Sequence, residues 1–119
     1  MQILRAIATT LIAMTGPALA DPAEIVDATA QITSAGWQFD VTIAHGDTGW
    51  EDYADGWRVE LADGTILGTR ILVHPHVEEQ PFTRSLREVA IPDGVETVHI
   101  RAATNVTGWA DTRRAVTLN

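Results

Sequence analysis

The sequence predicts an all-β domain, an antiparallel β-sandwich of about seven strands. Three observations favour this fold. Apolar and polar residues alternate over several short runs, which is the side-chain period of a half-buried strand. Turn-forming residues separate these runs at intervals of about eight to twelve residues. After the N-terminal segment, no stretch keeps a helical period over ten residues.

Residues 1–20 have the composition of a secretory signal peptide. Arg5 is their only charged residue, an apolar stretch follows it, and residues 18–20 (Ala-Leu-Ala) form a small-x-small cleavage pattern. The apolar stretch is shorter than the roughly 20 residues that a membrane-spanning helix needs. We therefore expect cleavage after Ala20, no membrane insertion afterwards, and one periplasmic or secreted domain at 21–119.

The first three expected strands show the clearest alternation. They cover about 25–32, 37–43 and 57–61, and the dipeptide Asp63-Gly64 follows the third. Asp-Gly is typical of a two-residue type I′ hairpin turn, in which both central residues have positive φ. The chain should therefore reverse there and return as a fourth strand.

Four further strands complete the expected sandwich. They cover about 65–74, 82–91, 98–102 and 112–118, with a Pro-Asp-Gly turn at 92–94. The apolar side of the alternating runs should form the core. The residues expected there are Trp37, Phe39, Val41, Trp57, Val59, Leu61, Val98 and Ile100.

Two segments resemble fibronectin type III domains. Residues 56–61 (Gly-Trp-Arg-Val-Glu-Leu) are similar to the third-strand pattern of that family, and 92–102 (Pro-Asp-Gly-Val-Glu-Thr-Val-His-Ile-Arg-Ala) to its turn into the sixth strand. Glu96 stands where the family usually has its corner tyrosine. The resemblance implies an immunoglobulin-like sandwich that serves as a binding or structural module and has no catalytic activity.

Three longer loops should meet at one end of the domain, because antiparallel strands reverse at each turn and alternate loops share an end. They are 45–55, 75–81 and 104–111, and the pattern Thr-Gly-Trp-x-Asp occurs in two of them, at 48–52 and 107–111. Exposed aromatic and acidic loop residues suit recognition. The candidate binding residues are Trp50, Asp52, Tyr53, Glu79, Arg84, Trp109 and Asp111. The alternative is that Trp50 and Trp109 close the end of the core.

The same loops contain candidate metal ligands. His74 and His76 flank a proline, which places both side chains on one face of an extended segment, and Glu78 and His45 could complete the set. Imidazole with carboxylate suits Zn(II) or Cu(II). If this site exists, the His74→Ala/His76→Ala double variant should lose metal binding. No other cofactor is expected.

Composition argues against several other functions. The chain contains no cysteine, which excludes thiol catalysis and disulfides. Without Arg5 it has seven arginines, no lysine and sixteen acidic residues, a formal charge of −9, so nucleic acid is a poor partner. The two serines, Ser34 and Ser85, lie outside any nucleophile-elbow pattern. We therefore expect that the protein is not an enzyme.

Three hypotheses about function follow. The first is an exported module that binds another exported protein or a small ligand through its loop-rich end. The second is a periplasmic metal-binding protein that uses the His-Pro-His-Val-Glu-Glu loop. The third is a structural accessory domain without a site. Exposure of the loop tryptophans separates the first from the third, and convergence of the histidine nitrogens tests the second.

Overall fold

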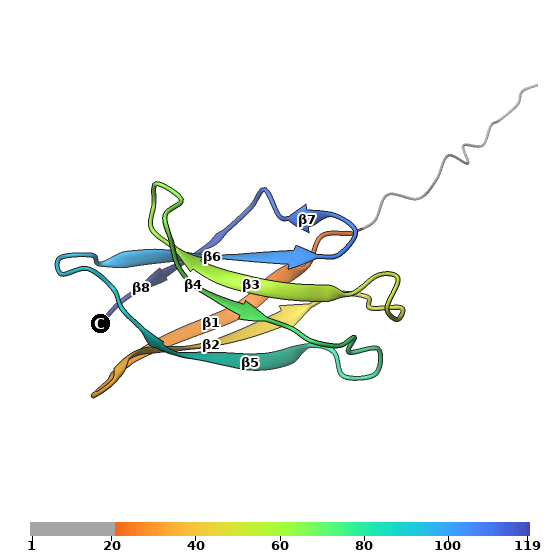
Figure 1. Cartoon of the computed structure of the whole chain (residues 1–119), viewed down its shortest axis with the longest axis horizontal. Helices are drawn as coiled ribbons and strands as arrows, with labels where there is room; N and C mark the ends of the chain where they lie inside the picture. The colour runs from red at the N-terminus through yellow and green to blue at the C-terminus, as the bar shows by residue number, and fades with distance from the viewer. Residues whose placement is uncertain (1–20) are drawn as a thin grey trace, which may run out of the picture.

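The computed structural model describes residues 21–119, and the expected signal peptide at 1–20 lies outside them. The described part is all-β and contains no helix, so no helix in it could cross a membrane. Eight strands follow one another along the chain (Figure 1). They are β1 (Glu24–Thr33), β2 (Gly36–Ala44), β3 (Ala54–Glu60), β4 (Ile66–Ile71), β5 (Phe82–Val89), β6 (Thr97–Thr104), β7 (Gly108–Trp109) and β8 (Arg114–Thr117).

The strands form two antiparallel sheets that face each other, as in a β-sandwich (Figure 1). The smaller sheet has the order β1-β2-β5. In the larger sheet β4, β3 and β6 lie side by side, and the short strands β7 and β8 pair with opposite halves of β6 along its free edge. Every pairing is antiparallel, which confirms the expected class of fold.

The apolar core lies between the sheets and contains most of the residues expected there. Six of the eight are completely buried: Phe39, Val41, Trp57, Val59, Val98 and Ile100. Trp37 is half-buried and packs against the core from one end of β2. Leu61 is also only half-buried, because β3 ends at Glu60 and the amide of Leu61 already donates to the Thr65 carbonyl across the hairpin.

The turn between β3 and β4 differs from the expected type I′ hairpin. Among the described residues, Glu88 is the only non-glycine with positive φ, so Asp63 does not have the required conformation. Instead the Gly64 amide donates to the Leu61 carbonyl, Gly64 has φ +92°, and the Asp63 carboxylate accepts from the Thr65 amide. This is a three-residue loop, in which the carboxylate cap favours a type I turn followed by glycine.

The strand count also differs from the expectation of about seven. The additional strand is β7, which lies inside the third long loop and pairs with the end of β6 through Trp109 and Gly108. Because it follows β6, it leaves the direction of the earlier strands unchanged. The three long loops therefore still extend from the same end of the molecule, opposite the β3–β4 hairpin (Figure 1).

Candidate functional site

Asp47 joins two of the three loops from a buried position. Its Oδ1 atom accepts from the amide of Ala54 at 3.0 Å, and its Oδ2 atom accepts from the amide of His76 at 2.7 Å. Oδ1 also lies 2.6 Å from Nδ1 of His45, and the Asp47 side chain is completely buried. A single carboxylate therefore fixes the first loop to the second, which confirms that these loops converge.

Asn105 joins the third loop to the first. Its Oδ1 atom accepts from the Tyr53 amide at 2.9 Å, and its Nδ2 atom donates to the Trp50 carbonyl at 3.0 Å. The backbone amide of Asn105 also donates to the Tyr53 carbonyl. Together with Asp47, this side chain holds all three loops in one rigid arrangement, which we call the loop end.

The two loop tryptophans do not close the core. Trp50 is 64% exposed, and its ring meets that of Tyr53 edge to face at 5.5 Å. Trp109 is 39% exposed and lies on the outer face of the larger sheet, with Cζ of Arg58 4.0 Å from its ring centre. The alternative in which both tryptophans plug the core is therefore wrong.

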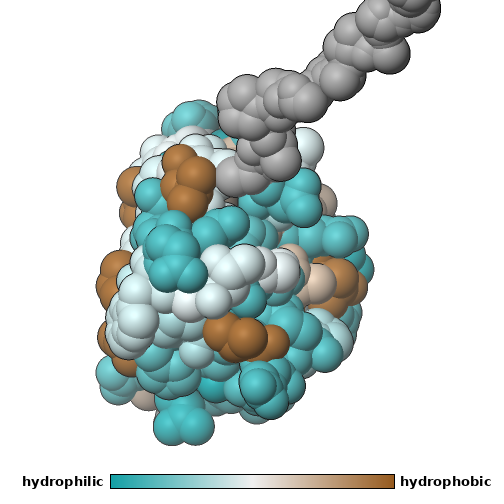
Figure 2. Space-filling model, turned by 90° about the vertical axis from the view of Figure 1, so that its right-hand side faces the viewer, coloured by the Kyte–Doolittle hydropathy of each residue, from teal (hydrophilic) through white to brown (hydrophobic). Residues whose placement is uncertain are grey.

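The repeated pattern does not produce two equivalent turns. Gly49 has φ +146° and forms an isolated antiparallel bridge with Asp52, whereas Gly108 has φ +73° and belongs to β7. The sequence similarity of these two loops therefore does not extend to their backbone. Exposed apolar side chains at the loop end are scattered in small groups among polar ones (Figure 2).

His76 lies below the surface of the second loop, on the aromatic ring of Phe82. The two rings are parallel within 10° and their centres are 3.9 Å apart. Nε2 of His76 accepts from Nη2 of Arg84 at 2.9 Å, and the same Nη2 donates to Glu79 at 3.2 Å. Burial, together with the positive charge of Arg84, lowers the pKa of His76 below its ordinary value of 6.5.

The predicted metal ligands do not form a joint site. His45 is bound to Asp47 and to the carbonyl of Asp21, His76 accepts from Arg84, and Nδ1 of His74 lies 3.0 Å from the Pro75 carbonyl. Across residues 21–119, no group of three or more histidine, aspartate or glutamate side chains is arranged to hold a metal ion. The expected set of four ligands does not converge; both ring nitrogens of His45 have partners inside the fold, and so does Nε2, but not Nδ1, of His76. Glu78 is exposed in the second loop.

The remaining predicted binding residues are divided between two places. Glu79 and Arg84 form an ion pair beside His76, and Asp111 is exposed after β7. Asp52 is half-buried, and its Oδ1 atom is 3.6 Å from Nε2 of His45. Among the predicted binding residues, Trp50 and Tyr53 form an aromatic pair.

A charged cluster on the outer face of the larger sheet was not expected. Arg58 and Glu60 alternate with inward-facing residues of β3, and Glu60 is completely buried beneath three guanidinium groups. Its carboxylate accepts from Arg58 at 2.7 Å, from Arg101 at 2.8 Å and from Arg113 at 3.0 Å. Burial alone would raise its pKa, but these hydrogen bonds lower the pKa of Glu60 to about 2.

No local sequence signal reveals this cluster or the role of Asp47. Arg58 and Glu60 lie on the polar side of an alternating strand, where side chains are usually exposed. Arg113, which also binds Glu60, is distant from it in the sequence. Asp47 lies in a His-Gly-Asp turn sequence that occurs in many loops. The partners of both carboxylates become visible only when distant strands are brought together.

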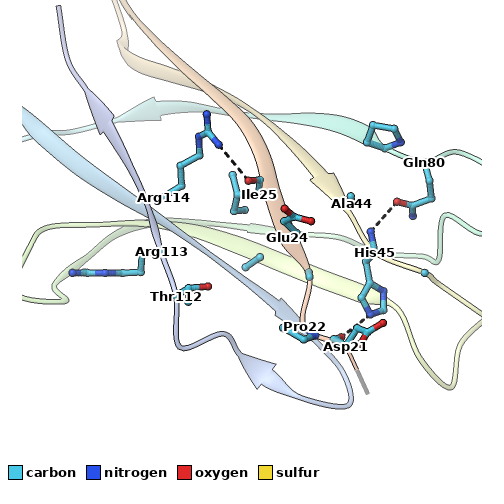
Figure 3. A pocket seen from close by; sticks show the side chains of 14 residues that line it. Asp21, Pro22, Glu24, Ile25, Ala44, His45, Gln80, Thr112, Arg113 and Arg114 are labelled. Carbon is cyan, nitrogen blue, oxygen red and sulfur yellow. Dashed lines mark hydrogen bonds between the residues drawn. The ribbon is translucent and has the colours of Figure 1, made fainter. Parts of the chain in front are cut away.

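One cavity of the described residues lies elsewhere, between β1 and the β6–β8 edge. It is an open pocket of about 780 Å³ (Figure 3). Its polar lining is largely bound already: His45 Nε2 to the Asp21 carbonyl, Gln80 to the His45 amide, and Arg114 at 3.5 Å from the Ile25 carbonyl. These contacts fasten the first described residues to the sandwich.

A protein of Halomicrobium mukohataei named "Putative lipoprotein" is 41% identical to this chain over 90 residues. The match covers 73% of this chain and 43% of that protein, so the chain spans less than half the length of its relative. No family model matches the chain, and no solved structure matches it.

Proposed function

We propose that this protein is an exported binding module that recognises another protein through its loop end. The observation that carries the proposal is the exposed ring of Trp50, packed edge to face on the half-buried Tyr53, on loops that Asp47 and Asn105 hold together. Large aromatic side chains on a rigid support bind with little loss of conformational entropy, and such residues dominate interface energies.

The proposed export rests on two supports. The composition of residues 1–20 is typical of a secretory signal. The name of the relative from Halomicrobium mukohataei describes a lipoprotein, which agrees with a place in the cell envelope or outside the cell. We propose that the domain acts there after cleavage, and that it is a binding module with no enzymatic activity.

Within the sandwich class we propose a fibronectin type III-like domain. Residues 56–61 and 92–102, which carry the resemblance, lie in β3 and in the turn that leads into β6. In the constant immunoglobulin domain the fourth strand belongs to the sheet of the first, second and fifth strands. Here β4 pairs with β3 instead, so the strand order disfavours that subtype.

A protein partner suits the loop end better than a small ligand. Drug-sized ligands bind in concave pockets, and the pocket of about 780 Å³ in residues 21–119 lies beside β1, with neither Trp50 nor Tyr53 in its lining. Trp50, supported by the half-buried Tyr53, instead projects from the surface, as interface anchors do.

The test is capture of partners from the envelope fraction of the native cell, with the mature domain as bait. The Trp50→Ala/Tyr53→Ala variant should lose the species that the wild type retains. Ile32→Ala is the matched control, because Ile32 is 60% exposed on the hairpin at the opposite end. Equal capture by all three proteins would contradict the proposal and favour a structural accessory domain.

A further inference from the structure

Arg58 is fixed on the outer face of the larger sheet by two independent contacts. Its Nε atom donates to Glu60 at 2.7 Å, and the plane of its guanidinium group lies over Trp109, with Cζ 4.0 Å from the ring centre. The hydrogen bond sets the direction of the side chain, and the ring restrains its tilt. The terminal nitrogens Nη1 and Nη2 are thus held in one orientation.

Among the described residues, Arg58 has two guanidinium nitrogens without a hydrogen bond, Arg113 has one, its Nε, and Arg101 has none. Arg101 donates to Glu60 and to the Ala110 carbonyl, and Arg113 donates to Glu60 and to two carbonyls after β3. Neither Nη1 nor Nη2 of Arg58 donates to a described residue, and neither is among the buried polar atoms that lack a partner. The side chain of Arg58 is 19% exposed, so a ligand on the solvent side can reach it.

The electrostatic balance of the cluster favours an anion. Three guanidinium groups surround one carboxylate, and the negative charge of Asp111 also acts on Arg101, which leaves one positive charge in excess on the face of a chain with a formal charge of −8. A planar guanidinium with two parallel N–H donors binds a carboxylate in a bidentate manner. A pre-oriented group loses little side-chain entropy on binding.

The surroundings of Arg58 add an apolar surface. Gly56 faces Ile71 in the β3–β4 register, and a Cβ atom on Gly56 would lie 3.8 Å from the ring of Trp109. Trp109 and Ile71, which is 62% exposed, therefore flank a position without a side chain. A ligand that reaches Arg58 can rest its apolar atoms on this platform.

We propose that Arg58 and Trp109 bind a carboxylate side chain in an acidic segment of a protein partner, with an apolar neighbour of that side chain packed between Trp109 and Ile71. This inference rests on the proposed function and names the chemistry that the partner must present. It extends the binding surface from the loop end to the outer face of the larger sheet.

The experiment uses residues 21–119 and a blocked peptide of alternating glutamate and leucine, with binding measured by calorimetry. We expect salt-sensitive binding that weakens about tenfold or more in Arg58→Gln, and also in Arg58→Lys, because lysine cannot form the bidentate pair. Arg87→Gln is the matched control, since Arg87 is exposed on β5 of the other sheet, and it should bind as the wild type does.

Three results would overturn this inference. They are equal binding of the corresponding glutamine–leucine peptide, equal weakening by Arg87→Gln, and tighter binding of inorganic polyphosphate than of the acidic peptide. Arg58→Lys keeps a positive charge beside Glu60, so it remains informative if Arg58→Gln does not fold. If only Trp50→Ala/Tyr53→Ala loses the captured partner and the Arg58 variants keep it, the proposed function stands and this inference fails.

Discussion

At the scale of single residues, Asp47 has both carboxylate oxygens bound to backbone amides that belong to different loops. Asp47→Ala should leave the amides of Ala54 and His76 without their acceptor in a buried place. A buried donor that loses a charged acceptor costs about 1.5–3 kcal/mol, so we expect a loss of at least about 3 kcal/mol from the free energy of unfolding. Denaturant unfolding measures it, and a change below about 1 kcal/mol would contradict this role.

Glu60 should make the fold sensitive to strong acid. Its pKa is lowered from 4.5 to about 2 in the folded chain, so its contribution to stability is complete above pH 4.5 and is lost as the pH falls towards 2. For this completely buried group, the contribution to the free energy of unfolding is about 3 kcal/mol. Glu60→Gln should unfold more easily at pH 7 and show a flatter stability curve between pH 4.5 and 2. An equal dependence of stability on pH in the wild type and in Glu60→Gln would refute this role of Glu60.

Protonation of His76 should lower the stability of the fold at milder pH than protonation of Glu60 does. Here the proton creates a positive charge, whereas in Glu60 it removes a negative one. Because the pKa of His76 is lowered in the folded chain, the unfolded chain binds the extra proton first. Stability should therefore be complete above pH 6.5 and decrease as the pH falls below that value. His76→Gln should flatten this decrease in thermal unfolding curves recorded from pH 7.5 to 5. His99→Gln, on the outer face of β6, is the control that should keep it.

At the scale of elements, β3 supplies two large buried side chains to the core. Its inward residues were predicted from alternation, and Trp57 and Val59 are completely buried. Trp57→Ala should cost about 3–5 kcal/mol of unfolding free energy. Trp57→Phe should cost less, because it also removes the buried indole N–H that lacks a partner among the described residues. Equal losses of unfolding free energy for Trp57→Ala and Trp57→Phe in chemical denaturation would contradict this account of the packing around Trp57.

The outward residues of β3 show where prediction from sequence ends. Alternation places Arg58 and Glu60 on the polar side of the strand, and a polar side is ordinarily exposed. Glu60 is buried because Arg101 from β6 and Arg113 from before β8 cover it. Those partners are more than 40 residues away, and no local pattern specifies them. Asp63-Gly64 likewise predicts the place of the β3–β4 turn but not its conformation, because the Asp63 carboxylate caps the Thr65 amide and only Gly64 has positive φ.

At the scale of the whole molecule, the end that carries the long loops could be predicted from strand direction alone. The hydrogen bonds of Asp47 and Asn105 confirm that the loops meet. Each of these bonds joins two loops, over 2.7–3.0 Å. Which side chains remain exposed there could not be predicted. The histidines of these loops, expected to bind metal, are bound to Asp47 and Arg84, whereas Trp50 is left outside.

The central claim is that the loop end contacts a protein partner, and site-specific photocrosslinking in the native cell envelope tests it most directly. A photoreactive amino acid replaces Trp50 in one variant and Ile32, at the opposite end, in another. The account predicts a discrete protein adduct from position 50 that is absent from position 32. No adduct at either position, or the same adduct at both, would contradict it.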